Sequence, residues 1–227
     1  KLTELIFKVL PGIRQYVCSD GTLYCRLLKA LYGCVQASKL WYDKLSAFLT
    51  GLGYQRCPVE PCVMKRVVDG KVYQLLIYVD DNLIITEEAE FEQLRAAFTK
   101  KFRWITMEVN DSLSYLGMQI ALGKGYVELD MIFYIDKALQ SYRGIVEQPT
   151  PGTKELFEIG QSALLDDDAR KQFHTTVARL LYLSKRVRPD IVTVVAFLCT
   201  RVKSPTVEDQ QKLERLLGYL KRTREWK

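Results

Sequence analysis

The sequence of 227 residues predicts an α+β fold, in which an antiparallel sheet carries helices on one face. Two stretches, 37–52 and 87–102, place apolar residues three and four positions apart, as amphipathic helices do. Between them, the apolar run 72–86 is interrupted only by Asp80-Asp81-Asn82, which indicates two strands joined by an acidic turn. With a strand before the first helix and another after the second, this order is typical of a split β-α-β sheet.

The first half of the chain follows this order element by element. The segment up to Leu27 alternates enough to predict a short strand pair around the turn at Ser19-Asp20-Gly21. The first helix is expected to end near Gly51 and Gly53. The second helix has acidic residues in its first turn and Lys100-Lys101 in its last, an arrangement that complements the helix dipole.

The second half is predicted to hold short strands, a linker and two long helices. The strands are expected at 104–109, 113–122 and 126–129. The segment 149–153, Pro-Thr-Pro-Gly-Thr, has the composition of a linker, so a domain boundary is expected near it. Thr206 and Asp209 resemble a variant capping box at the start of the last helix. The two helical patterns cover 170–202 and 206–222.

Composition restricts the class of protein. Apolar residues make up 48% and charged residues 26% of the chain, without low-complexity runs, as in folded soluble proteins. No apolar stretch approaches the roughly 20 residues of a membrane-spanning helix, and residues 1–11 lack signal-peptide features, so an intracellular protein is expected. The six cysteines form no CxxC pair and are expected to be buried or unreactive thiols.

The net charge of +6 is unevenly distributed along the chain. Residues 170–227 hold 14 Lys and Arg against 5 Asp and Glu, whereas residues 1–169 hold 19 against 22. A basic C-terminal quarter is compatible with a polyanionic partner. It is equally compatible with solvated helix faces, so charge alone does not decide between the two.

Two adjacent aspartates, Asp80 and Asp81, lie at the expected hairpin turn. Like charges this close repel unless solvent screens them or a cation lies between them. Mg²⁺ prefers hard oxygen ligands, and it commonly takes one or two carboxylates together with water and substrate phosphates. Two such ions support phosphoryl transfer by activating the attacking hydroxyl and stabilising the leaving oxygen. Asp and Asn are also ordinary turn residues, so a solvated turn without metal is the alternative.

Several motifs give the chain a resemblance to a known family. Residues 28–42, Leu-Lys-Ala-Leu-Tyr-Gly-Cys-Val-Gln-Ala-Ser-Lys-Leu-Trp-Tyr, are similar to the LKKALYGLKQAPRxWY pattern of copia-type LTR-retrotransposon reverse transcriptases. Tyr78-Val79-Asp80-Asp81 resembles their YxDD motif, and Ser114-Tyr115-Leu116-Gly117 resembles their FLG primer-grip strand. Leu217-Gly218-Tyr219-Leu220-Lys221 resembles part of their connection region. Matches in order from about residue 7 to residue 223 cover nearly the whole chain.

The resemblance implies an RNA-directed DNA polymerase with a reverse-transcriptase palm. Residues 1–122 would be partial fingers and palm, residues 123–165 a small thumb-like region with a linker, and residues 166–227 a helical connection leading toward a ribonuclease H domain. It implies Mg²⁺ as cofactor, with Mn²⁺ as an alternative, and as substrates a primer on an RNA or DNA template with deoxynucleoside triphosphates. Ribonuclease H and integrase would be neighbours in the parent Pol polyprotein, which would work in a cytoplasmic particle or the nucleus.

The same resemblance assigns roles to individual residues. Asp80 and Asp81 would be the catalytic and metal-binding residues, with Asp80 bound to both ions and Asp81 the weaker acid. The alternatives are local, because Gly117 could serve only a turn, Gln36 could cap a helix and Trp41 could be a core residue. The remaining assignments are contacts with primer or nucleotide by Tyr78, Val79, Gln36, Leu116 and Gly117, and with the template strand by Lys39.

The sequence departs from the family pattern in two respects. Residues 34–39, Cys-Val-Gln-Ala-Ser-Lys, stand where the family has Leu-Lys-Gln-Ala-Pro-Arg, and Lys is a poorer bidentate partner for phosphate than Arg. The family's aspartate-bearing strand, expected shortly before Glu4, is not in this sequence. The sequence is therefore expected to be a fragment without polymerase activity of its own. The alternative function is a catalytically silent nucleic-acid-binding remnant, and a metal-independent structural protein is a third hypothesis.

Overall fold

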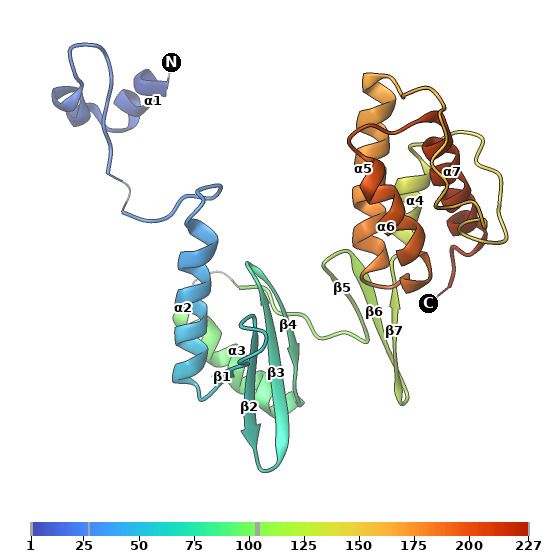
Figure 1. Ribbon diagram of the computed structural model, residues 1–227. Coiled ribbons are helices and arrows are strands. Elements are labelled where there is room, and N and C mark those ends of the chain that lie inside the picture. The colour runs from blue at the N-terminus through green and yellow to red at the C-terminus, as the bar shows by residue number, and fades with distance from the viewer. Residues whose placement is uncertain (1, 27, 103–104, 227) are drawn as a thin grey trace. The chain divides into compact units, whose positions relative to one another are not determined.

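A computed structural model describes residues 2–26, 28–102 and 105–226. It divides the chain into two compact units, Lys1–Arg103 and Trp104–Lys227. The first unit contains, in order, α1 (Leu2–Val9), the 3₁₀ helix η1 (Pro11–Tyr16), α2 (Ala37–Gly51), β1 (Gln55–Arg56), β2 (Val63–Val68), β3 (Lys71–Tyr78), β4 (Asp81–Ile85) and α3 (Glu88–Lys101) (Figure 1). The second contains β5 (Ser112–Tyr115), β6 (Met118–Gly123), β7 (Tyr126–Asp130), α4 (Ile132–Leu139), α5 (Asp167–Ser184), the 3₁₀ helix η2 (Pro189–Ile191), α6 (Val192–Arg201) and α7 (Val207–Arg222).

The sheet of the first unit is antiparallel, in the order β1-β2-β3-β4. Along β3, the alternate residues Tyr73, Leu75 and Ile77 are buried, because successive side chains of a strand point to opposite faces. The predicted helices at 37–52 and 87–102 and the predicted hairpin at 72–86 are therefore confirmed, and with them the α+β class. β4 is an edge strand of this sheet.

Aromatic side chains join α2 to α3. Phe48 on α2 lies edge-on to Phe98, with ring centroids 5.1 Å apart, and edge-on to Phe102 at 5.3 Å. Trp41, earlier on α2, lies 5.4 Å from Phe102. Such pairs add about 0.5–1.5 kcal/mol each beyond the burial of apolar area. They fix α2 in the position from which it reaches the β3–β4 turn.

A buried carboxylate ties α3 to the sheet. Glu90 is 6% exposed and accepts from Arg66 Nη1 of β2 at 2.6 Å and from Tyr54 Oη at 3.2 Å. Burial, together with the negative charge of Glu90, raises the pKa of Tyr54 far above its usual value. The buried charge is thus both paired and hydrogen-bonded, which is the condition for tolerating it inside a protein.

The second unit combines the antiparallel sheet β5-β6-β7 with a helical core. Three helices supply most of this core, and they pack around residues that are almost completely excluded from water. The core residues with zero exposure include Phe173, Leu180 and Leu183 of α5, Val195 and Leu198 of α6, and Leu213, Leu216, Leu217 and Leu220 of α7.

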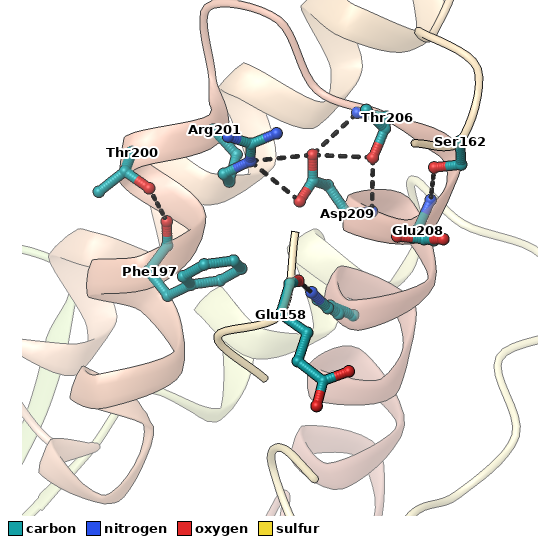
Figure 2. Close-up of polar contacts among 9 residues, drawn as sticks. Glu158, Ser162, Phe197, Thr200, Arg201, Thr206, Glu208 and Asp209 are labelled. Carbon is teal, nitrogen blue, oxygen red and sulfur yellow. Dashed lines mark hydrogen bonds and ion pairs between the residues drawn. The ribbon is translucent and has the colours of Figure 1, made fainter. Parts of the chain in front are cut away.

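The predicted capping box at the start of α7 is confirmed (Figure 2). Thr206 Oγ1 accepts from the Asp209 amide, and Asp209 Oδ2 accepts from the Thr206 amide at 2.9 Å. Arg201, at the end of α6, donates through Nε to both carboxylate oxygens of Asp209 at 3.2 Å. Ser162 Oγ accepts from the Glu208 amide at 3.2 Å, which attaches the preceding loop to the same helix end. These bonds satisfy backbone donors that a helix start otherwise leaves unpaired.

Gly218 allows a loop to approach α7 closely. A Cβ atom at this position would lie 2.2 Å from the carbonyl oxygen of Val146 and 2.8 Å from Gln148 Cγ. Only a residue without a side chain fits there, although glycine is a weak helix former. The glycine of the 217–221 motif therefore has a packing role in this protein.

The prediction for the first segment is wrong. Residues 2–9 form a helix, and no strand occurs among described residues 2–26. Leu5, Ile6 and Val9 have the three- and four-residue spacing of a helix face, which outweighs the weak alternation. The turn at 19–21 does exist, since Gly21 N donates to Cys18 O and Cys18 N donates to Thr22 O, but no ladder extends from it.

Three predictions for the second half need correction. Residues 105–109 are not a strand, and residue 104 lies outside the described residues. The single strand expected at 113–122 is the two strands β5 and β6, separated by a turn at Leu116-Gly117. The helix expected at 170–202 is interrupted between α5 and α6, because Pro189 disfavours helical backbone at Arg188.

Other features of the sequence can be compared with the structure directly. All six cysteines are free, three of them exposed and three half-buried, so none is fully buried. The described part of the chain contains no helix long and apolar enough to cross a membrane. The predicted boundaries at 122/123 and 165/166 both fall inside the second unit and stay predictions, as do the palm, thumb and connection assignments.

Candidate functional site

The two aspartates lie at the tip of the β3–β4 hairpin. Tyr78 pairs with Asp81 as the last cross-strand pair, so Val79 and Asp80 form the two-residue turn. Both carboxylates are exposed. The predicted location is confirmed, with the refinement that Asp81 is already the first residue of β4. Tyr78 and Asp81 also share one face of the hairpin, because directly paired residues point the same way.

The turn has a strained backbone. Val79 has φ of 53°, a left-handed conformation that is an outlier for a β-branched residue. Two-residue hairpins with positive φ at the first central position ordinarily place glycine there. Left-handed backbone costs a residue with a Cβ about 1–2 kcal/mol. Such strain persists only where the surrounding structure holds it in place, and it is concentrated at functional sites.

Trp41 supplies one of the contacts that hold this turn. Its Nε1 donates to the Val79 carbonyl oxygen at 2.5 Å, across 38 positions of sequence, while its ring packs on Phe102. The alternative to a base-stacking role, that Trp41 is a core residue, describes its ring, but the structure also gives its polar end a partner in the turn. The signal in the sequence was slight: a tryptophan at the end of a motif carries one donor that must be satisfied when the ring is half-buried.

Gln36 and Lys39 lie at the start of the same helix. Gln36 occupies the N-cap position of α2 but makes no side-chain capping bond, and it is exposed. The local alternative, that the Gln36 side chain caps the helix, is therefore not what the structure has. Lys39 pairs with Asp43 at 2.5 Å on the exposed surface, which is a weak interaction that solvent screens. Neither residue has a structural role that would exclude a ligand.

The donor set at the tip is limited to two carboxylates. Within residues 2–26, 28–102 and 105–226, no group of three or more His, Cys, Asp or Glu side chains could hold a metal ion. Asp80 and Asp81 nevertheless fit the share that a protein commonly supplies to Mg²⁺, one or two carboxylates, with water and phosphate completing the shell. Asn82 points to the opposite, helix-covered face by strand alternation, where its Oδ1 is buried without a partner in the described structure.

Leu116 and Gly117 belong to the second unit, where they form the turn between β5 and β6. Tyr115 pairs with Met118, and both turn residues have positive φ, 50° and 77°. Gly117 therefore serves a turn, as the local alternative proposed, although a Cβ there would meet nothing within 4 Å and its surface is open. The Leu116 carbonyl accepts from Tyr182 Oη of α5 at 2.6 Å. No sequence pattern connects these two residues, which lie 66 positions apart.

The structure qualifies the meaning of the basic C-terminal quarter, residues 170–227. Several of its cations are engaged inside the protein, where they organise helices and loops. Lys185 and Arg186, in contrast, are exposed just beyond α5. The Arg186 guanidinium lies 4.9 Å from the centroid of the Tyr182 ring. The cations of this segment that bond to other residues of the protein include Arg188 with Asp190 and Thr223, Arg201 with Asp209, Arg215 with Gln148 and Thr150, and Arg224 with Asp136.

Comparisons with known proteins give consistent results. Residues 3–149 match the family described as reverse transcriptase (RNA-dependent DNA polymerase). The chain is 26% identical over 218 residues to the Retrovirus-related Pol polyprotein from transposon TNT 1-94 of Nicotiana tabacum, which covers 91% of this chain and 16% of that protein. It is 28% identical over 215 residues to the Retrovirus-related Pol polyprotein from transposon RE1 of Arabidopsis thaliana, covering 92% and 14%. The chain thus spans less than a fifth of the length of these relatives, and no solved structure matches it.

Proposed function

Because the chain belongs to the reverse transcriptase (RNA-dependent DNA polymerase) family, we propose that it is the part of a copia-type retrotransposon polymerase that carries the YVDD hairpin. The observation that supports this function is the exposed pair Asp80 and Asp81 on a strained turn held by Trp41. In this proposal residues 1–122 are partial fingers and palm, 123–165 a thumb-like region with its linker, and 166–227 the connection.

Asp80 and Asp81 are the residues that would hold Mg²⁺, or Mn²⁺ in its place. When bound, the two ions of such a site activate the attacking hydroxyl and neutralise charge on the phosphate oxygens. The chain contributes a fixed position for the carboxylates. Trp41 holds the Val79 carbonyl, so the backbone that carries Asp80 is set before any ligand arrives. A site organised in advance avoids the cost of ordering itself during binding.

The neighbours of the aspartates suit a nucleic-acid strand. Tyr78 is 56% exposed on the same face as Asp81, and Val79 is 41% exposed at the tip, so both can lie against the end of a primer. Gln36 and Lys39 at the start of α2 are the proposed contacts for the nascent base pair and the template. In the second unit, Leu116 and Gly117 are the proposed primer contacts, and Lys185 and Arg186 add positive charge for phosphates.

The experiment is primer extension on an RNA template by a chain that contains residues 1–227 and is lengthened upstream to include an acidic strand. Extension should require Mg²⁺ or Mn²⁺ and disappear in Asp80→Asn. Asp69→Asn is the matched control, because Asp69 is an exposed turn residue with φ of 51° at the other end of β3. Equal extension by Asp80→Asn and Asp69→Asn would contradict the proposed catalytic role.

The second candidate function is binding of nucleic acid without catalysis. It is favoured by the absence, within the described residues, of a third acidic ligand near Asp80 and Asp81. The same experiment separates the two candidates. A lengthened chain that binds primer and template in a salt-dependent way but never extends the primer would support the silent remnant.

A further inference from the structure

The turn between β5 and β6 is short and conformationally demanding. Leu116 and Gly117 both have positive φ, the combination that type I′ hairpin turns require. Glycine adopts this backbone readily, whereas leucine does so against its own preference. The pair Tyr115 and Met118 closes the turn, and Met118 packs against the core of the second unit.

Tyr182 connects this turn to the rigid part of the same unit. It lies on α5 between Leu180 and Leu183, which both have zero exposure. Its ring contacts Tyr134 at 5.6 Å between centroids, and Arg186 lies over it at 4.9 Å. The ring thus has two neighbours that restrict it, and its hydroxyl donates to the Leu116 carbonyl oxygen at 2.6 Å.

This bond fixes the turn while leaving its outer surface free. Gly117 is exposed, and a Cβ built on it would meet nothing within 4 Å, so a ligand backbone can approach there. An open turn at a hairpin tip is otherwise among the more mobile parts of a sheet. A hydrogen bond from a helix to the first turn residue restricts that motion without covering the second.

We propose that Tyr182 is a positioning residue that fixes the Leu116–Gly117 turn for contact with a primer strand, an inference that rests on the proposed function. Tyr182 itself touches no substrate. Its hydroxyl fixes the orientation of the Leu116 carbonyl group. The peptide that follows belongs to Gly117, so the orientation of the exposed Gly117 backbone is fixed with it. The exposed cation Arg186 lies next to the Tyr182 ring, and a positive charge there suits a phosphate backbone.

The test compares Tyr182→Phe with Tyr142→Phe in the full chain. Tyr182→Phe removes only the hydroxyl and leaves the ring contacts. Tyr142→Phe is the matched control, because Tyr142 Oη also donates a hydrogen bond within the second unit, to Thr176 Oγ1 at 3.2 Å. Hydrogen exchange of the Gly117 and Met118 amides should accelerate about twofold to tenfold in Tyr182→Phe, as expected for one lost hydrogen bond. The control should leave these amides unchanged.

A second measurement uses fluorescence anisotropy with a DNA primer on an RNA template. Tyr182→Phe should weaken binding by a similar factor with an unchanged salt slope, because no phosphate contact is removed. Unchanged exchange at Gly117 and Met118 would overturn the inference, and so would faster exchange with the same affinity as Tyr142→Phe. If the unmutated chain binds no primer–template, the proposed function fails, and the primer part of this inference fails with it even where the exchange result confirms the anchoring.

Discussion

At the scale of single residues, the candidate site depends on an unfavourable backbone and a side chain that compensates for it. Val79 has φ of 53°, which a valine does not adopt without support from its surroundings. The Trp41 indole provides such support, since its ring is fixed against Phe102 and its N–H is directed at the Val79 carbonyl. The strained turn and its support come from elements far apart in the sequence, so they act together only in the folded unit.

Trp41→Phe should loosen the aspartate-bearing turn. The substitution removes the donor to Val79 O while keeping an aromatic ring near Phe102. We expect a loss of about 0.5–1.5 kcal/mol in the free energy of unfolding from the hydrogen bond, with a further loss from the smaller ring. Amide exchange at Asp80 and Asp81 should accelerate. The measurements are urea denaturation and hydrogen exchange resolved to single amides.

Tyr42→Phe is the control for this prediction. Tyr42 follows Trp41 on α2 and donates through Oη to the Pro61 carbonyl at 2.7 Å, so the lost bond is of the same kind. Its partner is in the loop before β2, not in the aspartate turn. The same acceleration at Asp80 in both variants would mean that Trp41 has no specific hold on the turn.

The two aspartates could be predicted from sequence, whereas their support could not. Adjacent acids between two apolar runs form a pattern within one short segment, so the sequence of that segment is enough to predict a hairpin with the acids at its turn. The bonds from Trp41 to Val79 and from Tyr182 to Leu116 join residues 38 and 66 positions apart. No periodicity within a segment encodes such contacts, because they depend on how whole elements pack.

At the scale of elements, prediction succeeded where one period dominated and no special backbone intervened. The helices at 37–51, 88–101 and 207–222 all have clear apolar spacing, and the structure confirms them. The pattern at 113–122 predicts one strand and not β5 and β6, because Leu116-Gly117 is not a typical sequence for a left-handed turn, as Asn-Gly is. Likewise, apolar spacing continues through 185–191, but the backbone restriction imposed by Pro189 ends the helix first.

Gly218→Ala should destabilise the second unit even though alanine favours a helix. The gain in helix propensity is about 0.5–1 kcal/mol. A Cβ would meet the Val146 carbonyl oxygen at 2.2 Å, and inserting an atom into such a packed contact commonly costs about 1–3 kcal/mol. We therefore expect a net loss of unfolding free energy, measured by urea denaturation. Gln211→Ala, on the exposed side of the same helix, should not show this loss; stabilisation by Gly218→Ala would contradict the close approach.

Acid should weaken the contact between α4 and the C-terminal end. Arg224 donates to both carboxylate oxygens of Asp136, at 2.5 and 2.7 Å, and these bonds lower the pKa of Asp136. A second carboxyl with a lowered pKa is that of Asp190 in η2. Burial alone would raise the pKa of Asp190, but hydrogen bonds from Arg188 and Tyr219 lower it by more.

The direction of the pH effect follows from these lowered values. In the unfolded chain each carboxyl takes up a proton near the ordinary aspartate pKa of about 3.9, whereas in the folded chain it does so only at lower pH. Their contribution to stability is therefore present above about pH 4 and is lost as the pH falls through the lower folded values. Asp136→Asn should flatten the acid side of a plot of unfolding free energy against pH. An acid side identical to that of the unmutated chain would show that the Arg224 contact does not contribute.

At the scale of the whole molecule, the proposed catalytic residues and the proposed primer contacts are divided between two compact units. Asp80 and Asp81 belong to the first unit, whereas Leu116, Gly117 and Tyr182 belong to the second. Each unit holds its own turn with its own aromatic donor, so each local geometry is built independently. The family match, over residues 3–149, extends across the division between the units.

The polypeptide of residues 1–227, used by itself, should not extend a primer. Two ions need carboxylates from more than one strand, and the hairpin tip offers only Asp80 and Asp81 within the described residues. Mg²⁺ affinity should therefore be weak. β4 is also the edge of an apolar sheet, and an edge strand with unpaired backbone groups favours association between copies, so low solubility should accompany inactivity.

The measurement is primer extension with Mg²⁺ or Mn²⁺ on an RNA template, with isothermal titration of Mg²⁺ in parallel. A chain lengthened upstream by an aspartate-bearing strand serves as the comparison, since an added strand can pair with β4 and bring a third carboxylate to Asp80 and Asp81. Extension and tighter Mg²⁺ binding should appear together in the longer chain, because both depend on the same added ligand. Robust extension by residues 1–227 alone, abolished by Asp80→Asn, would show instead that two carboxylates on one turn are sufficient.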